Sequence, residues 1–263
     1  MQYEGILRLA VFLGLLVLFA GLETLSPRRA RQRRRGRRWL TNLGLVVLGS
    51  AVLRVLAIAL PYLAVGAAVD AWRQGLGLFN QLSWPLWVEV LLALLIFDLA
   101  IWAQHWLTHK VPLFWRFHRV HHADRDMDVT TGLRFHPVEI AASMGLKIGL
   151  VYLIGPQPLA VLLFELILNA TALFNHANLA LPRWLDAVLR LVVVTPEMHL
   201  VHHSQRREEH DSNYGFALSV WDRIFHTYRP RSRDGAAAMV VGLEWQDDGP
   251  ERLGWSLLLP FRK

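Results

Sequence analysis

Histidine is the residue whose spacing in this sequence can support chemistry. Eleven of the twelve histidines fall between His105 and His210, and most of them stand in three clusters. The clusters are H-x-x-x-H at His105 and His109, H-x-x-H-H at His118, His121 and His122, and H-x-x-H-H at His199, His202 and His203. Residues three or four apart share one face of a helix, so each cluster can aim two or three imidazoles at one point. Neutral imidazole binds iron, zinc and copper, and the pattern therefore predicts metal binding.

The number of histidines indicates more than one metal ion. A single metal rarely takes more than about six ligands, and structural zinc usually takes four. His136 and His176 flank a predicted helical hairpin and bring the candidates to ten, whereas His210 and His226 are interpreted as ordinary polar residues. The sequence has no cysteine, which excludes thiolate ligands and disulfides. We expect a dimetal site with nitrogen or oxygen ligands.

Long apolar runs must position these histidines. Ile6–Leu22, Leu43–Val69 and Pro85–Ala103 each reach or approach the roughly 20 residues that cross a bilayer as a helix. Glu139–Gly155 and Pro158–Asn175 are shorter and are joined by a Gly-Pro-Gln-Pro turn, which predicts a helical hairpin. We therefore predict an all-α integral membrane protein with four to five membrane-embedded helices, three spans plus the hairpin, and a helical cap that holds the histidines.

The charge distribution predicts the orientation of this single domain, residues 1–263. The net charge of +7 is concentrated in the basic loop 28–38, directly after the first apolar segment, 1–26. Cationic loops stay in the cytoplasm, so this loop predicts membrane topology rather than nucleic-acid binding. The first segment has no evident cleavage site and is interpreted as a retained anchor. The histidines of the histidine-box region 96–228 and a loop-rich tail, 229–263, then face the cytoplasm, and Asp70–Ser83 lies outside.

Charged residues inside the predicted spans should have partners, because an unpaired charge there is costly. Lys147 and Glu165 lie at nearly equal distances from the hairpin tip and are expected to pair. Arg54 and Asp98 lie at similar depth on consecutive antiparallel helices and are a second candidate pair.

Asp98 also stands one heptad before His105, on the same helical face, where it can orient a histidine ring. Glu197, Asp124 and Asp211 are further carboxylate candidates for that role. Pro182–Val194 alternates apolar and charged residues and predicts a helix in the membrane interface. Asn213, Tyr214 and Asp222 are open to a role at the site or to an ordinary role in turns and packing.

The order of these motifs resembles the fatty acid hydroxylase superfamily, also called the sterol desaturase family. The resemblance runs from about Ile96 to Tyr228 through H-W-L-T-H, H-R-V-H-H, F-H-P-V-E, N-H-A-N, P-E-M-H-L-V-H-H, N-Y-G and W-D-R-I-F. Trp106 and His226 depart from the pattern, where many members have Arg and Gly. The resemblance implies these metal ligands: His105, His109, His118, His121, His122, His199, His202 and His203, with His176 and His136 completing the set.

The resemblance also implies an O2-dependent di-iron enzyme, with zinc as a possible substitute metal. Its substrates would be sterols, fatty acyl chains, sphingoid bases, alkylglycerols or carotenoids, and hydroxylation and desaturation stay open. The sequence has no nucleotide, flavin, haem or iron–sulfur motif, so electrons would come from a ferredoxin, rubredoxin or cytochrome-type partner. A metal transporter or metal-binding protein, a metal-dependent lipid hydrolase and a non-catalytic lipid-binding scaffold are the alternatives.

Overall fold

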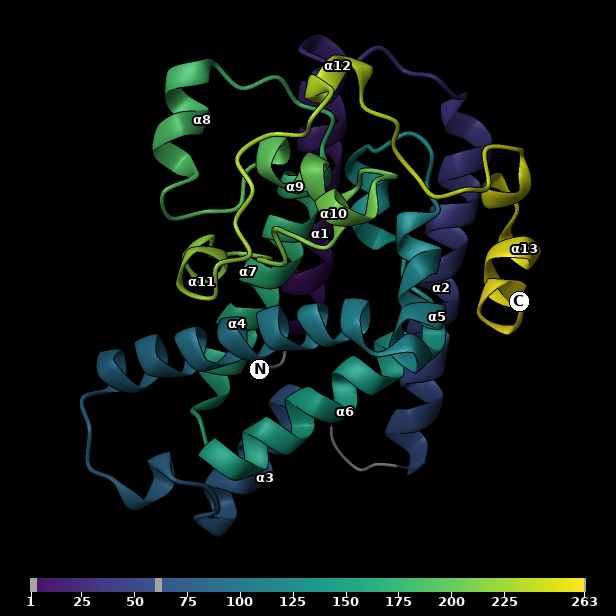
Figure 1. Ribbon diagram of the computed structural model, residues 1–263. Coiled ribbons are helices and arrows are strands. Elements are labelled where there is room, and N and C mark those ends of the chain that lie inside the picture. The colour runs from purple at the N-terminus through teal and green to yellow at the C-terminus, as the bar shows by residue number, and fades with distance from the viewer. Residues whose placement is uncertain (1–3, 60–62, 263) are drawn as a thin grey trace.

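The computed structural model describes residues 4–59 and 63–262, and its long helices meet a cap of short helices (Figure 1). The described residues contain isolated β-bridges but no strand. The long helices are α1 (Glu4–Leu25), α2 (Arg35–Ala59), α4 (Leu86–Lys110), α6 (Pro137–Ile154) and α7 (Pro158–His176), and the shorter α3 (Ala64–Gln74) packs among them. The cap begins with α5 (Pro112–His122). The cap adds α8 (Arg183–Leu189), α9 (Pro196–His202), α10 (Arg207–His210), α11 (Val220–Ile224), α12 (Gly235–Ala238) and α13 (Leu253–Leu258), and 3-10 turns lie at Phe79–Gln81 (η1), Val129–Leu133 (η2), Gly249–Glu251 (η3) and Leu259–Phe261 (η4).

Five of these helices, α1, α2, α4, α6 and α7, are long and apolar enough to cross a membrane. The predicted all-α integral membrane fold is thereby confirmed. One predicted span was wrong in its extent. Leu43–Val69 is divided between α2 and α3, residues 60–62 lie outside the described residues, and α3 packs as a separate short helix against α6 and α7.

The hairpin of α6 and α7 is formed as expected. Proline occupies the first turn of both helices, where its missing N–H costs nothing, and α6 ends at Gly155 with a left-handed φ of 64°. A side chain at Gly155 would collide with the carbonyl oxygen of Leu76, so the turn needs glycine for space as well. Nζ of Lys147 lies 2.8 Å from a carboxylate oxygen of Glu165, which confirms the predicted pair, and Arg8 of α1 binds the same carboxylate at 2.7 Å.

The second predicted pair was wrong. Asp98 is buried and accepts hydrogen bonds from the indole of Trp221 and the backbone N–H of Leu218. Arg54 is exposed, and no ion pair joins it to Asp98 in the described part of the chain. Counting residues along two helices shows how deep a residue lies in each but not the side to which its side chain points.

The basic segment 28–38 is more ordered than a free loop. Helix α2 already begins at Arg35, and Arg38 is buried between Asp124 and Asp128, 2.7 and 2.8 Å away. Arg28 binds Glu197, so the segment fastens α9 to the membrane helices.

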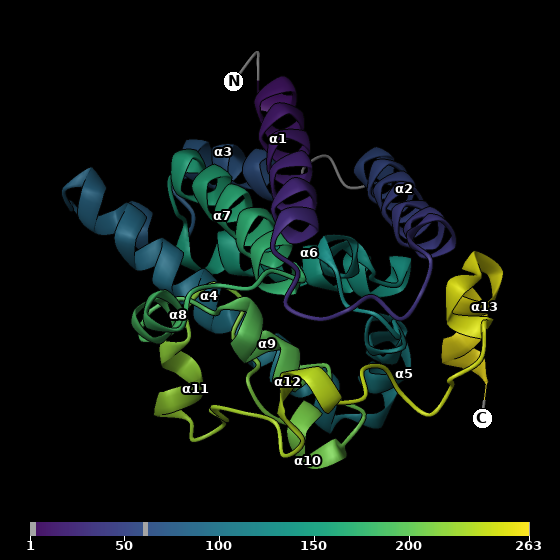
Figure 2. The same ribbon diagram turned by 90° about the horizontal axis from the view of Figure 1, so that it is seen from above.

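The tail after Arg229 is also more structured than expected. Figure 2 shows α13 beside α2, on the outside of α5. The buried guanidinium of Arg134 holds this segment by donating to the carbonyl oxygen of Pro250 and the hydroxyl of Ser256, 2.9 and 2.8 Å away.

Candidate metal centre

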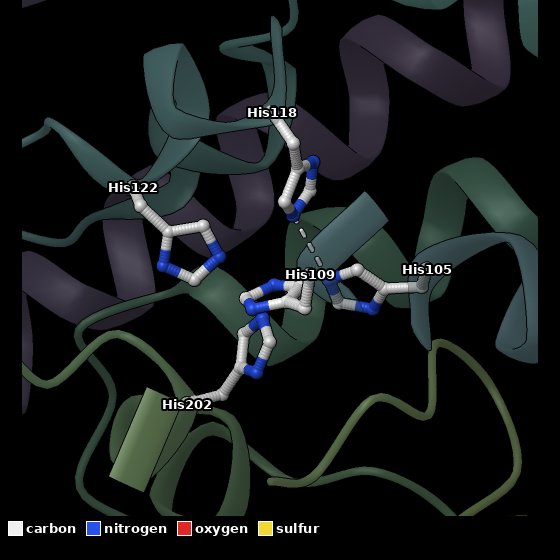
Figure 3. A group of neighbouring side chains, drawn as sticks. All are labelled: His105, His109, His118, His122 and His202. Carbon is white, nitrogen blue, oxygen red and sulfur yellow. Dashed lines mark hydrogen bonds between the residues drawn. The ribbon is translucent and has the colours of Figure 1, made fainter. Parts of the chain in front are cut away.

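Five histidines from three helices converge on one point, which we call site A (Figure 3). They are His105 and His109 of α4, His118 and His122 of α5, and His202 of α9. One ring nitrogen from each lies within 4.8 Å of the others, and all five side chains are buried. Helix α5 begins at Pro112 directly after α4 ends, so the first two clusters turn back toward one another.

Four more histidines form a second group, site B, beside the first. They are His121 of α5, His176 of α7, His199 of α9, and His203, which directly follows α9. Helices α5 and α9 therefore serve both sites, because adjacent residues such as His121 and His122 point in different directions. Thr195 caps α9 through its side-chain oxygen, which fixes where the third cluster begins.

The hydrogen bonds of His105 and His118 determine which ring nitrogens are free. Nδ1 of His105 donates to the carbonyl oxygen of Tyr214, and Nδ1 of His118 donates to a carboxylate oxygen of Glu139. In both bonds the donor and acceptor atoms are 2.7 Å apart. In the neutral rings both Nε2 atoms are then unprotonated, yet they face each other 3.1 Å apart. Two lone pairs at this distance repel unless a cation lies between them, so site A fits a metal ion.

Site B is arranged in a similar way. Nδ1 of His176 donates to the carbonyl oxygen of Ala172 at 2.7 Å. Its Nε2 then lies 3.1 Å from Nε2 of both His121 and His199. One unprotonated nitrogen faces two others, which again fits a metal ion.

Several further ring nitrogens are buried without a hydrogen-bond partner among the described residues. Both nitrogens of His109, His122 and His203 are in this state, and so is Nε2 of His202. A buried polar group without a partner costs about 1–3 kcal/mol. A metal ion at each site would satisfy one nitrogen of each of these rings, so the unpaired imidazoles fit metal binding.

Burial also keeps the cap histidines neutral. Removal from water, followed by the repulsion of neighbouring histidines, lowers the pKa of His122, His202 and His203 well below the usual value. The pKa values of His121 and His199 are lowered for the same reasons. Neutral imidazoles have the lone pair that binds a metal ion.

One predicted ligand lies apart from both groups. Nδ1 of His136 accepts a hydrogen bond from the backbone of Val138 and caps α6, while its other nitrogen contacts the carbonyl oxygen of Leu257. His210 is buried beside site A, where its ring stacks on Trp115, and His226 is exposed.

Three of the four carboxylates proposed from sequence bind partners other than histidine, and the fourth, Asp211, lies beside His109. Asp98, Glu197 and Asp124 bind Trp221, Arg28 and Arg38 respectively, and Asp211 lies 3.5 Å from Nδ1 of His109 without a hydrogen bond. The carboxylate that does bond to a histidine is Glu139, which sequence reasoning missed. The quoted F-H-P-V-E motif contained the signal, because its glutamate stands in the first turn of α6.

One face of the double site is apolar. Phe135 stacks on His121 with ring centroids 4.5 Å apart and also contacts His118. Phe216 packs edge-on against His105 and at a tilt against His199. The two phenyl rings therefore touch histidines of both sites, and they adjoin the apolar core between α3, α4, α6 and α7.

The helices and the two histidine groups define an integral membrane protein with a buried candidate two-metal centre. The family model described as fatty acid hydroxylase matches residues 90–227, which is more than half of the chain. The chain belongs to the fatty acid hydroxylase family.

Three similar proteins are lipid-oxidising enzymes by name. Ornithine lipid hydroxylase OlsE of Rhizobium tropici is 32% identical over 58% of this chain, and the match covers 46% of that protein. Alkylglycerol monooxygenase of Homo sapiens is 30% identical over 50% of this chain and 28% of its own length. Human cholesterol 25-hydroxylase is 30% identical over 55% of this chain and 52% of its own length. The chain thus spans about half or less of each, and no solved structure matches it.

Proposed function

We propose that this protein hydroxylates a membrane lipid with O2 at a di-iron centre held by sites A and B. The observation that carries the proposal is the pair of histidine groups, one of five and one of four residues, within a chain of the fatty acid hydroxylase family. Bound iron would supply the redox chemistry that breaks an unactivated C–H bond. The balance is RH + O2 + 2 electrons + 2 protons giving ROH and water.

The ligand set supports iron rather than a hard oxygen-preferring metal. Imidazole suits iron, copper and zinc, and the described groups contain only imidazole in sites A and B. Zinc would bind the same nitrogens but cannot change its oxidation state, so we assign it the role of a substitute. His136 is left out of the proposed ligands because both of its ring nitrogens have other partners.

The substrate is proposed to be a lipid with a polar headgroup and a long apolar part. The named relatives act on an ornithine lipid, alkylglycerol and cholesterol, which share that division. We propose that the reacting carbon approaches from the side of Phe135 and Phe216, because these rings join the apolar core to both sites. Because all three named relatives are hydroxylases or monooxygenases, hydroxylation is favoured over desaturation.

The histidine sites are proposed to face the cytoplasm. Arg28 of the basic segment binds Glu197, two residues before His199, so the segment and the sites lie on the same side of the protein. An electron carrier of ferredoxin, rubredoxin or cytochrome type would reach the centre from that side. A rate of reduction by such a carrier that falls with added salt would support electrostatic docking, whereas a salt-independent rate would contradict it.

Two other functions are less well supported. A transporter would need histidines along a path near the midplane, whereas these stand at the ends of α4 and α7 and in the cap. A metal-dependent hydrolase is less well supported because the three named relatives are hydroxylases or monooxygenases.

Labelled oxygen tests the proposal directly. The full chain, loaded with iron in lipid nanodiscs, would be supplied with 18O2, a chemical reductant and extracted bacterial lipids. We expect a lipid product heavier by one 18O atom, and none from a His203→Ala variant prepared in the same way. Label taken from H2(18)O instead would indicate hydrolysis and would contradict the proposal.

A further inference from the structure

Two tryptophan–aspartate hydrogen bonds, one buried and one partly buried, join α4 to the cap next to site A. The indole of Trp221 donates a hydrogen bond of 2.8 Å to Asp98 on α4. The indole of Trp102 on α4 donates a hydrogen bond of 3.0 Å to Asp222 of α11. Trp102 stands one turn before His105 on the same helix. The proposed centre uses neither aspartate as a ligand, so each needs an explanation.

Asp222 has an unusually complete set of donors. One carboxylate oxygen accepts from Trp102, from the backbone N–H of Tyr214 at 2.8 Å and from the hydroxyl of Thr227 at 2.7 Å. The other oxygen accepts from the backbone N–H of Gly215 at 2.8 Å. The side chain is fully buried, and all four partners are donors, which an ionised carboxylate matches and an amide does not.

The peptide that Asp222 holds is the one that reaches site A. The carbonyl oxygen of Tyr214 accepts the Nδ1 proton of His105 over 2.7 Å. Gly215 completes the turn because a side chain there would lie 2.7 Å from the carbonyl oxygen of Leu218 and 2.9 Å from Asp222. Two short bonds therefore connect Asp222 to a ring nitrogen of a site A histidine.

We propose that Asp222 is a positioning residue of the metal centre. It fixes the Tyr214 carbonyl, which keeps the proton of His105 on Nδ1 and leaves Nε2 free toward His118. The proposal rests on site A binding a metal, which is part of the proposed function. Outer partners that orient a metal-binding histidine typically contribute 10- to 100-fold to metal affinity.

Asp98 provides the matched control. Asp98 is buried on α4, the helix of His105, and it binds Trp221 of α11, the helix that carries Asp222. Its bonds go to Trp221 and Leu218 and not to the Tyr214–Gly215 peptide that holds His105. A purely structural role for these tryptophan–aspartate bonds predicts similar effects for both aspartates. A positioning role predicts that only Asp222 affects metal binding.

The experiment titrates Co2+ into the metal-free full chain in detergent and follows the visible absorption of cobalt. We expect Asp222→Asn to lower the affinity for one of two Co2+ ions by at least tenfold and to change the absorption spectrum of that ion. The Asp98→Asn variant should bind both ions as the wild type does. Wild-type affinity and spectrum in Asp222→Asn, or equal losses in both variants, would overturn the proposal. A wild-type chain that binds no Co2+ would overturn the proposed centre itself, and this inference with it.

A milder variant keeps the test decisive if Asp222→Asn does not fold. Thr227→Val removes one donor to the carboxylate and leaves the other three. We expect the affinity for Co2+ to fall severalfold at one site and to stay unchanged at the other. Unaltered binding of both ions in a folded Thr227→Val chain would count against Asp222 as a positioning residue.

Discussion

Nδ1 of His118 donates a hydrogen bond to Glu139, with 2.7 Å between nitrogen and oxygen. The bond joins α5, which supplies histidines to both sites, to the first turn of α6 in the membrane hairpin. This bond fixes the ring orientation of a site A histidine. It also makes α6 part of the centre, because α6 supplies no member of either histidine group, whereas α7 supplies His176.

Replacing Glu139 should therefore weaken site A. We expect Glu139→Gln to reduce metal affinity at one site by about 10- to 100-fold, because an amide holds the Nδ1 proton less firmly than a carboxylate does. Metal content after dialysis against a weak chelator measures the effect. Glu89→Gln is the control, since Glu89 is buried in α4 and binds the backbone of Gln157 at the hairpin tip. Equal metal loss in both variants would show that Glu139 has no special role.

Gly132 is expected to be essential to site B. A methyl group there would lie 2.4 Å from the carbonyl oxygen of Ala172, which accepts the proton of His176, and 3.1 Å from the His176 ring. We predict that Gly132→Ala displaces this carbonyl and lowers metal content by about one ion per chain. Gly145→Ala, on open space in α6, should keep both ions. Full metal occupancy in a folded Gly132→Ala protein would refute this prediction.

The charge network around Glu165 predicts unequal effects of two substitutions. Glu165→Gln leaves both Lys147 and Arg8 without their shared carboxylate, whereas Lys147→Met leaves the Arg8 bond intact. Removing one member of a buried ion pair costs about 3–5 kcal/mol. We expect Glu165→Gln to lower the unfolding temperature in detergent clearly more than Lys147→Met does. A larger loss in Lys147→Met would contradict the network.

The proposed orientation can be tested because the chain has no cysteine. Arg231, between α11 and α12 in the cap, and Arg73 on α3 are both exposed. Figure 1 shows α12 and α3 at opposite ends of the molecule. In intact bacterial cells, a membrane-impermeant maleimide should label Arg73→Cys, and it should label Arg231→Cys only after lysis. The reverse pattern would place the histidine sites outside the cytoplasm.

Features of the site that depend on one helix or one turn could be predicted from the sequence. The spacing of His105 and His109, or of His118 and His122, is readable because residues four apart share a helical face. The depth of Lys147 and Glu165 followed from their distances to one turn. These predictions need only helix geometry and chain order.

The partners that cross between elements were not predictable in the same way. The carbonyl oxygens of Tyr214 and Ala172 orient His105 and His176, but every residue has such an oxygen and no side chain marks the ones used. Asp98 shares a helical face with His105 but bonds to Trp221 and not to a histidine or to the exposed Arg54. Which cap residue reaches α4 depends on tertiary packing.

Counting iron in the purified, catalytically active chain is the most direct test of the two-site account. We predict two iron ions per chain and a Mössbauer spectrum of two iron environments, with one ion lost when either His105 of site A or His176 of site B is replaced by alanine. An active chain that holds one iron ion or none would contradict the account.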